Sequence, residues 1–167
     1  LKQIQAFNKG IDPTFEELSD AKTNIFSGAA ADPSCRNQKS LENRMKKKKE
    51  AGAKFIQTQM IMEKNFLIEF CEKISNPLEI PVIAGVFLLK SYKNALFINK
   101  YVPGANIPDD ILNRLKFAKD PLKEGIQIAA EQAQDYINIA SGIHLMAVKA
   151  EHLIPEIIKK ANINLEY

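Results

Sequence analysis

The sequence contains no long hydrophobic run. The longest apolar stretch, residues 80–89, includes Pro81 and Gly85 and is far shorter than the roughly 20 residues that cross a bilayer. The first residues, Leu1 to Asn8, are amphipathic and have neither the apolar core nor the cleavage site of a secretory signal. We therefore expect a cytoplasmic protein that does not contact membranes.

Cysteine and histidine are also scarce. Cys35 and Cys71 form no CxxC or Cys/His motif, and the two histidines, His144 and His152, lie outside any cluster of possible ligands. Metal sites need several such residues at characteristic spacing. We expect two reduced thiols, structural histidines and no metal site.

An excess of charge of one sign is missing too. The formal net charge is +3, 26% of the residues are charged, and no basic stripe carries interleaved aromatic side chains, so nucleic acid is not an expected partner. With 167 residues, 46% of them hydrophobic, the chain is long enough for one domain with a real core. It starts at Leu1 rather than at a methionine, and we expect it to be part of a longer protein.

The hydrophobic pattern predicts strands that alternate with helices. The strands are expected at residues 23–30, 53–59, 80–87 and 142–148. The helices are expected at residues 1–8, 40–51, 66–76, 91–100, 108–118, 121–140 and 151–161, with a polar loop at 11–22. Such alternation indicates an α/β fold whose four strands are parallel.

Glycine-rich phosphate-binding loops are absent after all four predicted strands, since neither GxGxxG nor GxxxxGK(S/T) occurs there. This disfavours a nucleotide-binding doubly wound sheet. Four consecutive βα units are also half of a (β/α)8 barrel, in which ligands bind at the carboxyl ends of the strands.

Two glutamines lie near the carboxyl end of the second predicted strand. Alternation places Gln57 and Gln59 on the same face. Buried amides need hydrogen-bond partners, so the pair either is satisfied inside the barrel or faces a ligand. We assign Gln57 to the interior and Gln59 to a ligand.

Five stretches of the sequence together resemble the methylenetetrahydrofolate reductase family. They are GAAADP (28–33), KKKKEAGAKFIQTQ (46–59), IPVIAGVFLLKSYKNALF (80–97), VPGANIPDDILNRL (102–115) and GIHLMAV (142–148). The resemblance implies that residues 1–167 are a single domain, the C-terminal half of a (β/α)8 TIM barrel whose N-terminal half is absent.

The resemblance also implies an activity. The family reduces 5,10-methylenetetrahydrofolate to 5-methyltetrahydrofolate in one-carbon metabolism with a bound flavin, FAD or FMN, and with NAD(P)H or a partner electron carrier as donor. The protein supplies position and electrostatics, while the flavin supplies the hydride chemistry. The family's catalytic glutamate lies in the missing half, so the half-barrel is expected to be inactive alone.

Several residues correspond to the family's binding positions. Gln59 matches the glutamine that contacts folate and the nicotinamide donor. Lys48 matches the lysine beside the phosphate-bearing flavin tail, and Arg44 is expected to contact the same tail. Ala31 and Asp32 match the strand-end pair beside the flavin.

Two further residues are assigned to the substrate. Tyr92 follows the third predicted strand, where it either stacks on folate or packs on the next helix. Lys149 falls near the arginine that follows the family's last strand.

Two other functions are consistent with the sequence. The chain is alternatively a non-catalytic binding or assembly module, because an open half-barrel exposes two strand edges and favours a homo-oligomer or a partner subunit. The third possibility is another (β/α)8 enzyme with the same phosphate-binding architecture.

Overall fold

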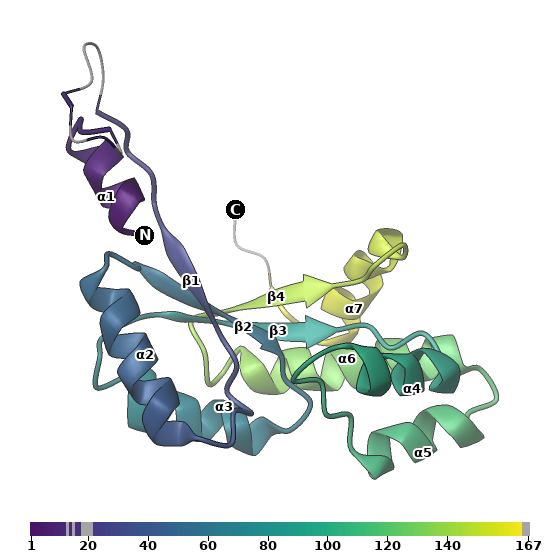
Figure 1. Ribbon diagram of the computed structural model, residues 1–167. Helices are drawn as coiled ribbons and strands as arrows, with labels where there is room; N and C mark the ends of the chain where they lie inside the picture. Colours follow the sequence, from purple (N-terminus) through teal and green to yellow (C-terminus); the bar gives the residue numbers. More distant parts are fainter. Residues whose placement is uncertain (13, 15, 18–21, 165–167) are drawn as a thin grey trace.

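The computed structural model describes residues 1–12, 14, 16, 17 and 22–164. Four parallel strands form one sheet in the order of the sequence. They are β1 (Gly28–Ala31), β2 (Phe55–Met60), β3 (Val82–Phe87) and β4 (Gly142–Met146) (Figure 1). The predicted set of four parallel βα units is confirmed.

Seven α-helices accompany the sheet in the described part of the chain. They are α1 (Lys2–Asn8), α2 (Gln38–Glu50), α3 (Lys64–Phe70), α4 (Tyr92–Tyr101), α5 (Asp109–Phe117), α6 (Pro121–Tyr136) and α7 (Ile154–Lys160). A π-helical turn, Cys71–Ser75, extends α3, and a 3₁₀ turn, Glu151–Leu153, precedes α7.

Side-chain caps fix the starts of three helices. Asn37 accepts a hydrogen bond from the backbone of Ser40 at the start of α2. Ser91 caps α4 in the same way, and Asp120 caps α6. Such caps satisfy backbone N–H groups that have no partner within the helix.

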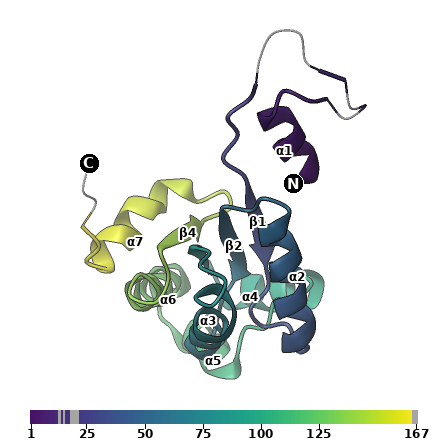
Figure 2. The ribbon, with the colours of Figure 1, turned by 90° about the vertical axis from the view of Figure 1, so that its left-hand side faces the viewer.

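The two faces of the sheet differ in what covers them. One face packs on α2, α3 and α6 and buries Ile56, Val82 and Ala84 in the main core. The opposite face leaves Gln59 exposed and Phe55 half-buried. Figures 1 and 2 show these helices on one side of a curved sheet and α1 beyond its other side. We call the face that carries Phe55 and Gln59 the open face.

A second, smaller core lies beside the sheet among α4, α5 and α6. It contains Leu89, Ile98 and Leu115, all of them buried. The two helices that precede α6 therefore form an extra layer next to the carboxyl end of β3.

The first predicted strand is mostly wrong. Of residues 23–30, only 28–30 are in β1, which continues to Ala31. Thr23 and Ile25 instead hydrogen-bond the side chain of Asn8 in α1. This segment and α1 project away from the sheet (Figure 1), so residues 23 and 25 bond to a helix rather than to a strand. The predicted loop at 11–22 lies partly outside the described residues.

Other predicted elements differ at their ends. Pro108 caps α5 rather than opening it, and α6 ends at Tyr136, four residues before the expected end. β4 stops at Met146 instead of residue 148. Helix ends fray and shift by a turn because local sequence fixes them weakly.

Among the described residues, the structure contains no helix with the length and hydrophobicity needed to span a membrane.

Candidate functional site

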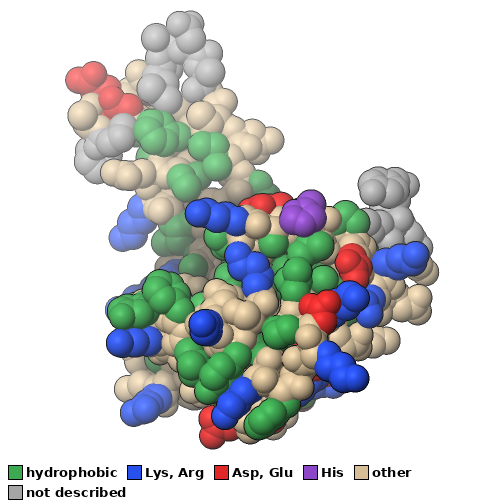
Figure 3. Space-filling model, turned by 90° about the vertical axis from the view of Figure 1, so that its right-hand side faces the viewer, with side chains coloured by type: hydrophobic (Ala, Val, Ile, Leu, Met, Phe, Trp, Pro, Cys, Tyr) green, Lys and Arg blue, Asp and Glu red, His purple; other side chains and the backbone are tan. Residues whose placement is uncertain are grey.

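The carboxyl ends of all four strands meet at one edge of the sheet because the strands are parallel. Figure 3 views the molecule from the side toward which β3 and β4 point, and shows Lys and Arg side chains distributed among hydrophobic ones. There, the Lys90 ammonium donates to the carbonyl of Val148, 2.9 Å away, and links the segments that follow β3 and β4. The sequence predicts a ligand at this edge of the sheet.

Gln59 lies on the open face near the end of β2. Its neighbour Thr58 points the opposite way and is buried, as strand alternation requires. The Thr58 hydroxyl accepts from the N–H of Gly85 at 2.8 Å and donates to the carbonyl of Gln59 at 2.7 Å. These two hydrogen bonds of Thr58 fix the backbone next to the Gln59 side chain. The side-chain amide of Gln59 has no hydrogen-bond partner in the described part of the chain.

Close approach of β2 and β3 explains a glycine at position 85. A Cβ atom there would lie 2.6 Å from the carbonyl oxygen of Gln59, a distance that real Cβ contacts essentially never show. The register between the strands also shifts between Gln57 and Met60. The backbone at the end of β2 therefore lies in close contact with β3 at Gly85.

Gln57 points to the open face as well, but it does not bond Gln59. Its amide nitrogen lies 2.9 Å from Nδ1 of His144 on β4. Its amide is therefore hydrogen-bonded, but to a histidine and on the open face, where the side chain is half-buried rather than in the core. The sequence gave no signal for this pair, because 87 positions separate the two residues.

Two cations lie together beside β1. Lys48 donates from Nζ to the carbonyl of Ala30 at 2.5 Å, and Arg44, one helical turn away, donates to the sulfur of Cys35 at 3.3 Å. Burial lowers the pKa of Lys48, and the charge of Arg44 lowers it further. Among the described residues neither cation has a carboxylate partner within salt-bridge distance, so this spot suits an anion.

Ala31 and Asp32 lie at the end of β1 but face different surroundings. The Ala31 side chain is buried in the main core, which leaves only its backbone for a ligand. The Asp32 carboxylate accepts from the N–H and the hydroxyl of Ser34. It lines a cleft of about 660 Å³ that also touches Phe66 on α3 and Asn106 before α5.

Tyr92 and Lys149 complete the predicted set. Tyr92 opens α4 and packs against the second core, with the Lys116 ammonium 5.8 Å from its ring centre. Lys149 is exposed, has a φ of +56° and donates its N–H to the carboxylate of Glu151. Tyr92 and Lys149 lie at the same edge of the sheet as Gln59, whereas Arg44 and Lys48 lie beside β1.

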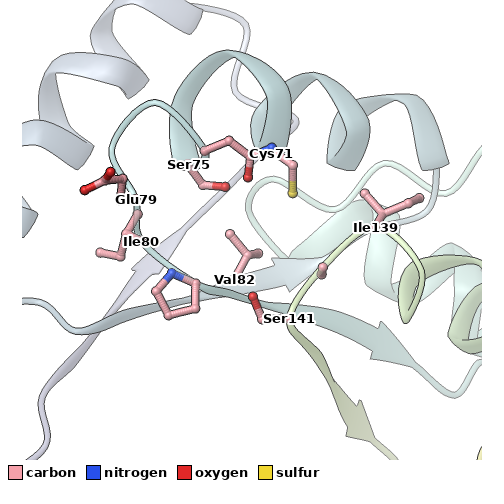
Figure 4. A pocket seen from close by; sticks show the side chains of 10 residues that line it. Cys71, Ser75, Glu79, Ile80, Val82, Ile139 and Ser141 are labelled. Carbon is pink, nitrogen blue, oxygen red and sulfur yellow. The ribbon is translucent and has the colours of Figure 1, made fainter.

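A second pocket lies at the opposite edge of the sheet, at the amino ends of β3 and β4 (Figure 4). Its volume is about 270 Å³, and Cys71, Ser75 and Ser141 contribute to its lining. Burial raises the pKa of the Cys71 thiol, which keeps the sulfur protonated and unreactive. The amino-terminal edge of βα units contributes to stability rather than catalysis, so we assign this pocket no function.

Comparisons with known proteins add the following. A sequence model of the methylenetetrahydrofolate reductase family matches residues 21–162. No curated protein matches the chain. A solved structure described as an uncharacterized protein from Clostridium thermocellum that binds two copies of 5-methyl-5,6,7,8-tetrahydrofolic acid has a TM-score of 0.58 and 21% identity. The match covers 80% of this chain and 51% of that one, so the chain spans about half the length of a protein with the same fold.

Proposed function

This chain belongs to the methylenetetrahydrofolate reductase family, and on that premise we propose that it forms part of a cytoplasmic flavoprotein that reduces 5,10-methylenetetrahydrofolate to 5-methyltetrahydrofolate. The observation that carries the proposal is Gln59, whose unpaired amide stands on the open face at the carboxyl end of β2. An amide both donates and accepts hydrogen bonds, as the edge of a pterin ring requires.

The cation pair beside β1 supports a flavin with phosphate groups. Burial is the main cause that lowers the pKa of Lys48, and the charge of Arg44 lowers it further. An anionic tail near them would offset both effects, because it favours the charged form of the lysine. When bound, FAD or FMN would supply the hydride chemistry, after reduction by NAD(P)H or a partner electron carrier.

The remaining predicted residues have smaller roles in this proposal. Tyr92 and Lys149 border the substrate at the carboxyl edge of the sheet, and the backbone of Ala31 and Asp32 borders the flavin. The catalytic glutamate would come from the other half of the barrel. Residues 1–167 by themselves would therefore be inactive.

The folate ligand has independent support from a protein of the same fold, since the similar C. thermocellum structure is described as binding 5-methyltetrahydrofolic acid. Its printed description names folate binding and no reaction. Binding without reduction is thus the second candidate function, and it makes this chain a folate-binding or assembly module.

A variant and the spectrum of the wild-type protein together test these candidates. In the full-length protein, Gln59→Ala should abolish reduction of methylenetetrahydrofolate while the flavin absorption spectrum remains. Gln134→Ala is the matched control, because Gln134 is an exposed glutamine on α6 away from the open face. A wild-type protein that binds folate but shows no flavin spectrum would favour the binding module and contradict the reductase.

A further inference from the structure

The open face carries a histidine that the proposed reaction does not yet use. His144 on β4 is half-buried, and its Nδ1 lies 2.9 Å from the Gln57 amide nitrogen. Gln57 is on β2, so the two side chains meet across β3, above the backbone that runs between them. A contact that joins alternate strands on an uncovered sheet face holds both side chains in fixed positions.

The hydrogen bond also fixes where the proton of the imidazole lies. The amide nitrogen of Gln57 is a donor, so Nδ1 of His144 accepts, and the neutral ring carries its proton on Nε2. Within the described residues, Nε2 has no hydrogen-bond partner, and the only buried side-chain nitrogen or oxygen without one is Oε1 of Gln132. Nε2 of His144 is therefore accessible, with its N–H available to a ligand.

The sheet register shows what lies beside that N–H group. Gly85 on β3 pairs with Met60, next to Gln59, on one side and with His144 on the other. Because Gly85 has no side chain, no side chain of β3 stands between His144 and the end of β2 in this row of the sheet. The backbone of β3 beside His144 is therefore open to the flat face of a ligand.

Apolar side chains lie next to His144 on this face. Phe87 and Met146 are register partners one row nearer the carboxyl edge, on the same face as His144. The face thus carries polar side chains near Gly85 and apolar side chains nearer the carboxyl ends of the strands. Flat heterocycles with polar edges fit such a surface.

We propose that His144 is a ligand-binding residue of this face, with Gln57 holding it in the Nε2–H tautomer. The Nε2–H group donates to an acceptor on the edge of a heterocycle that lies over Gly85, opposite Gln59. The identity of that heterocycle as the pterin ring of a reduced folate rests on the proposed function.

Nitrogen NMR of the full-length protein tests this directly. The chain contains two histidines, so His152→Gln on the exposed surface leaves His144 as the only one in this half. The free protein should show the Nε2–H tautomer. Addition of 5-methyltetrahydrofolate should shift the Nε2 resonance more than that of Nδ1.

Two variants give a second readout. His144→Phe should weaken binding of 5-methyltetrahydrofolate about tenfold, the worth of one net hydrogen bond. Gln57→Leu should weaken it less and should abolish the tautomer preference of His144. The unfolding midpoint of each variant confirms that the loss is not a loss of fold.

The possible failures are distinguishable. Folate binding with an unshifted Nε2 resonance, or undiminished affinity of a folded His144→Phe variant, overturns this inference and leaves the proposed function intact. A folded wild-type protein that does not bind 5-methyltetrahydrofolate overturns the proposed function and the folate assignment of His144 together.

Discussion

At the scale of single residues, alternation along β2 predicted more than composition did. It placed Gln57 and Gln59 on one face, and the structure confirms this. Alternation is local, so it needs no knowledge of the rest of the fold. The hydrogen-bond partner of Gln57 could not be predicted from the sequence, because its pairing with His144 depends on the register of β3 against β4.

Gln132 allows a prediction about stability. It is buried on α6 and its Oε1 has no partner among the described residues, while its amide nitrogen reaches only the sulfur of Met62 at 3.8 Å. Gln132→Met should raise the free energy of unfolding by about 1 kcal/mol, because it removes an unsatisfied buried acceptor and nearly preserves the volume. Chemical denaturation measures the change.

The exposed neighbour Gln134 provides the control for this substitution, and Gln134→Met should leave the free energy of unfolding unchanged. A Gln132→Met variant less stable than the wild type would show that Oε1 has a partner in solution, such as a buried water molecule.

At the scale of elements, helices and strands were predicted in the right order, while their ends were predicted less well. The caps of α4 and α6, Ser91 and Asp120, are residue types that favour helix starts, and both helices begin within a residue of the predicted position. The strand predicted at residues 23–30 begins only at Gly28, and Thr23 and Ile25 hydrogen-bond Asn8 of α1 instead. These bonds join residues 15 and 17 positions apart, so a local sequence pattern does not contain them.

The packing of α6 against the segment after β3 depends on Gly125. A Cβ atom at this position would lie 1.7 Å from the carbonyl oxygen of Leu89, so the helix must move. Gly125→Ala should lower the free energy of unfolding by about 1–3 kcal/mol despite alanine's higher helix propensity. Thermal or chemical unfolding measures it, and a neutral or stabilising effect would show that α6 is not seated as described.

Ion pairs hold α5 against α6. Arg114 contacts Glu131 at 2.6 Å and Glu124 at 2.7 Å, and the hydrogen bond from Arg114 is the main cause that lowers the pKa of Glu131. A carboxyl whose pKa is lowered by folding stabilises the protein above its unfolded pKa, near 4.3 for Glu, and this contribution is lost as the pH falls through the folded value.

The free energy of unfolding of Arg114→Met should therefore depend less on pH in the acid range than that of the wild type. Its free energy of unfolding should be lower than that of the wild type at neutral pH, and the difference should shrink below a pH of about 4.3. Denaturation curves over this pH range measure the difference. A gap that stays constant with pH would assign the loss to packing of the Arg114 side chain instead of to charge.

At the scale of the whole molecule, the parallel half-barrel was predictable because α/β alternation has few solutions. What covers the open face was not predictable, since a local hydrophobic pattern does not specify the partner of an exposed sheet face. Phe26 shows the problem directly. It is 72% exposed and stacks on Phe55 at 5.7 Å, which leaves an aromatic pair at the rim of the open face.

This surface makes the state of the isolated chain a test of the half-barrel proposal. Residues 1–167 alone should elute above their 18.8 kDa mass and carry no flavin, because exposed apolar surface and unpaired strand edges favour association. Co-expression with the other half of the barrel should give a soluble complex with a flavin spectrum. A flavin-free monomer that is stable alone would contradict the half-barrel proposal.

The strand order β1-β2-β3-β4 also has a consequence for synthesis. Every strand pairs with the one made just before it, so no strand depends on a partner that is synthesised later. Each βα unit can dock as it leaves the ribosome, and the growing end of the sheet always presents a fresh edge to the next strand. The same property that leaves this half open would let a barrel be assembled from one end to the other during translation.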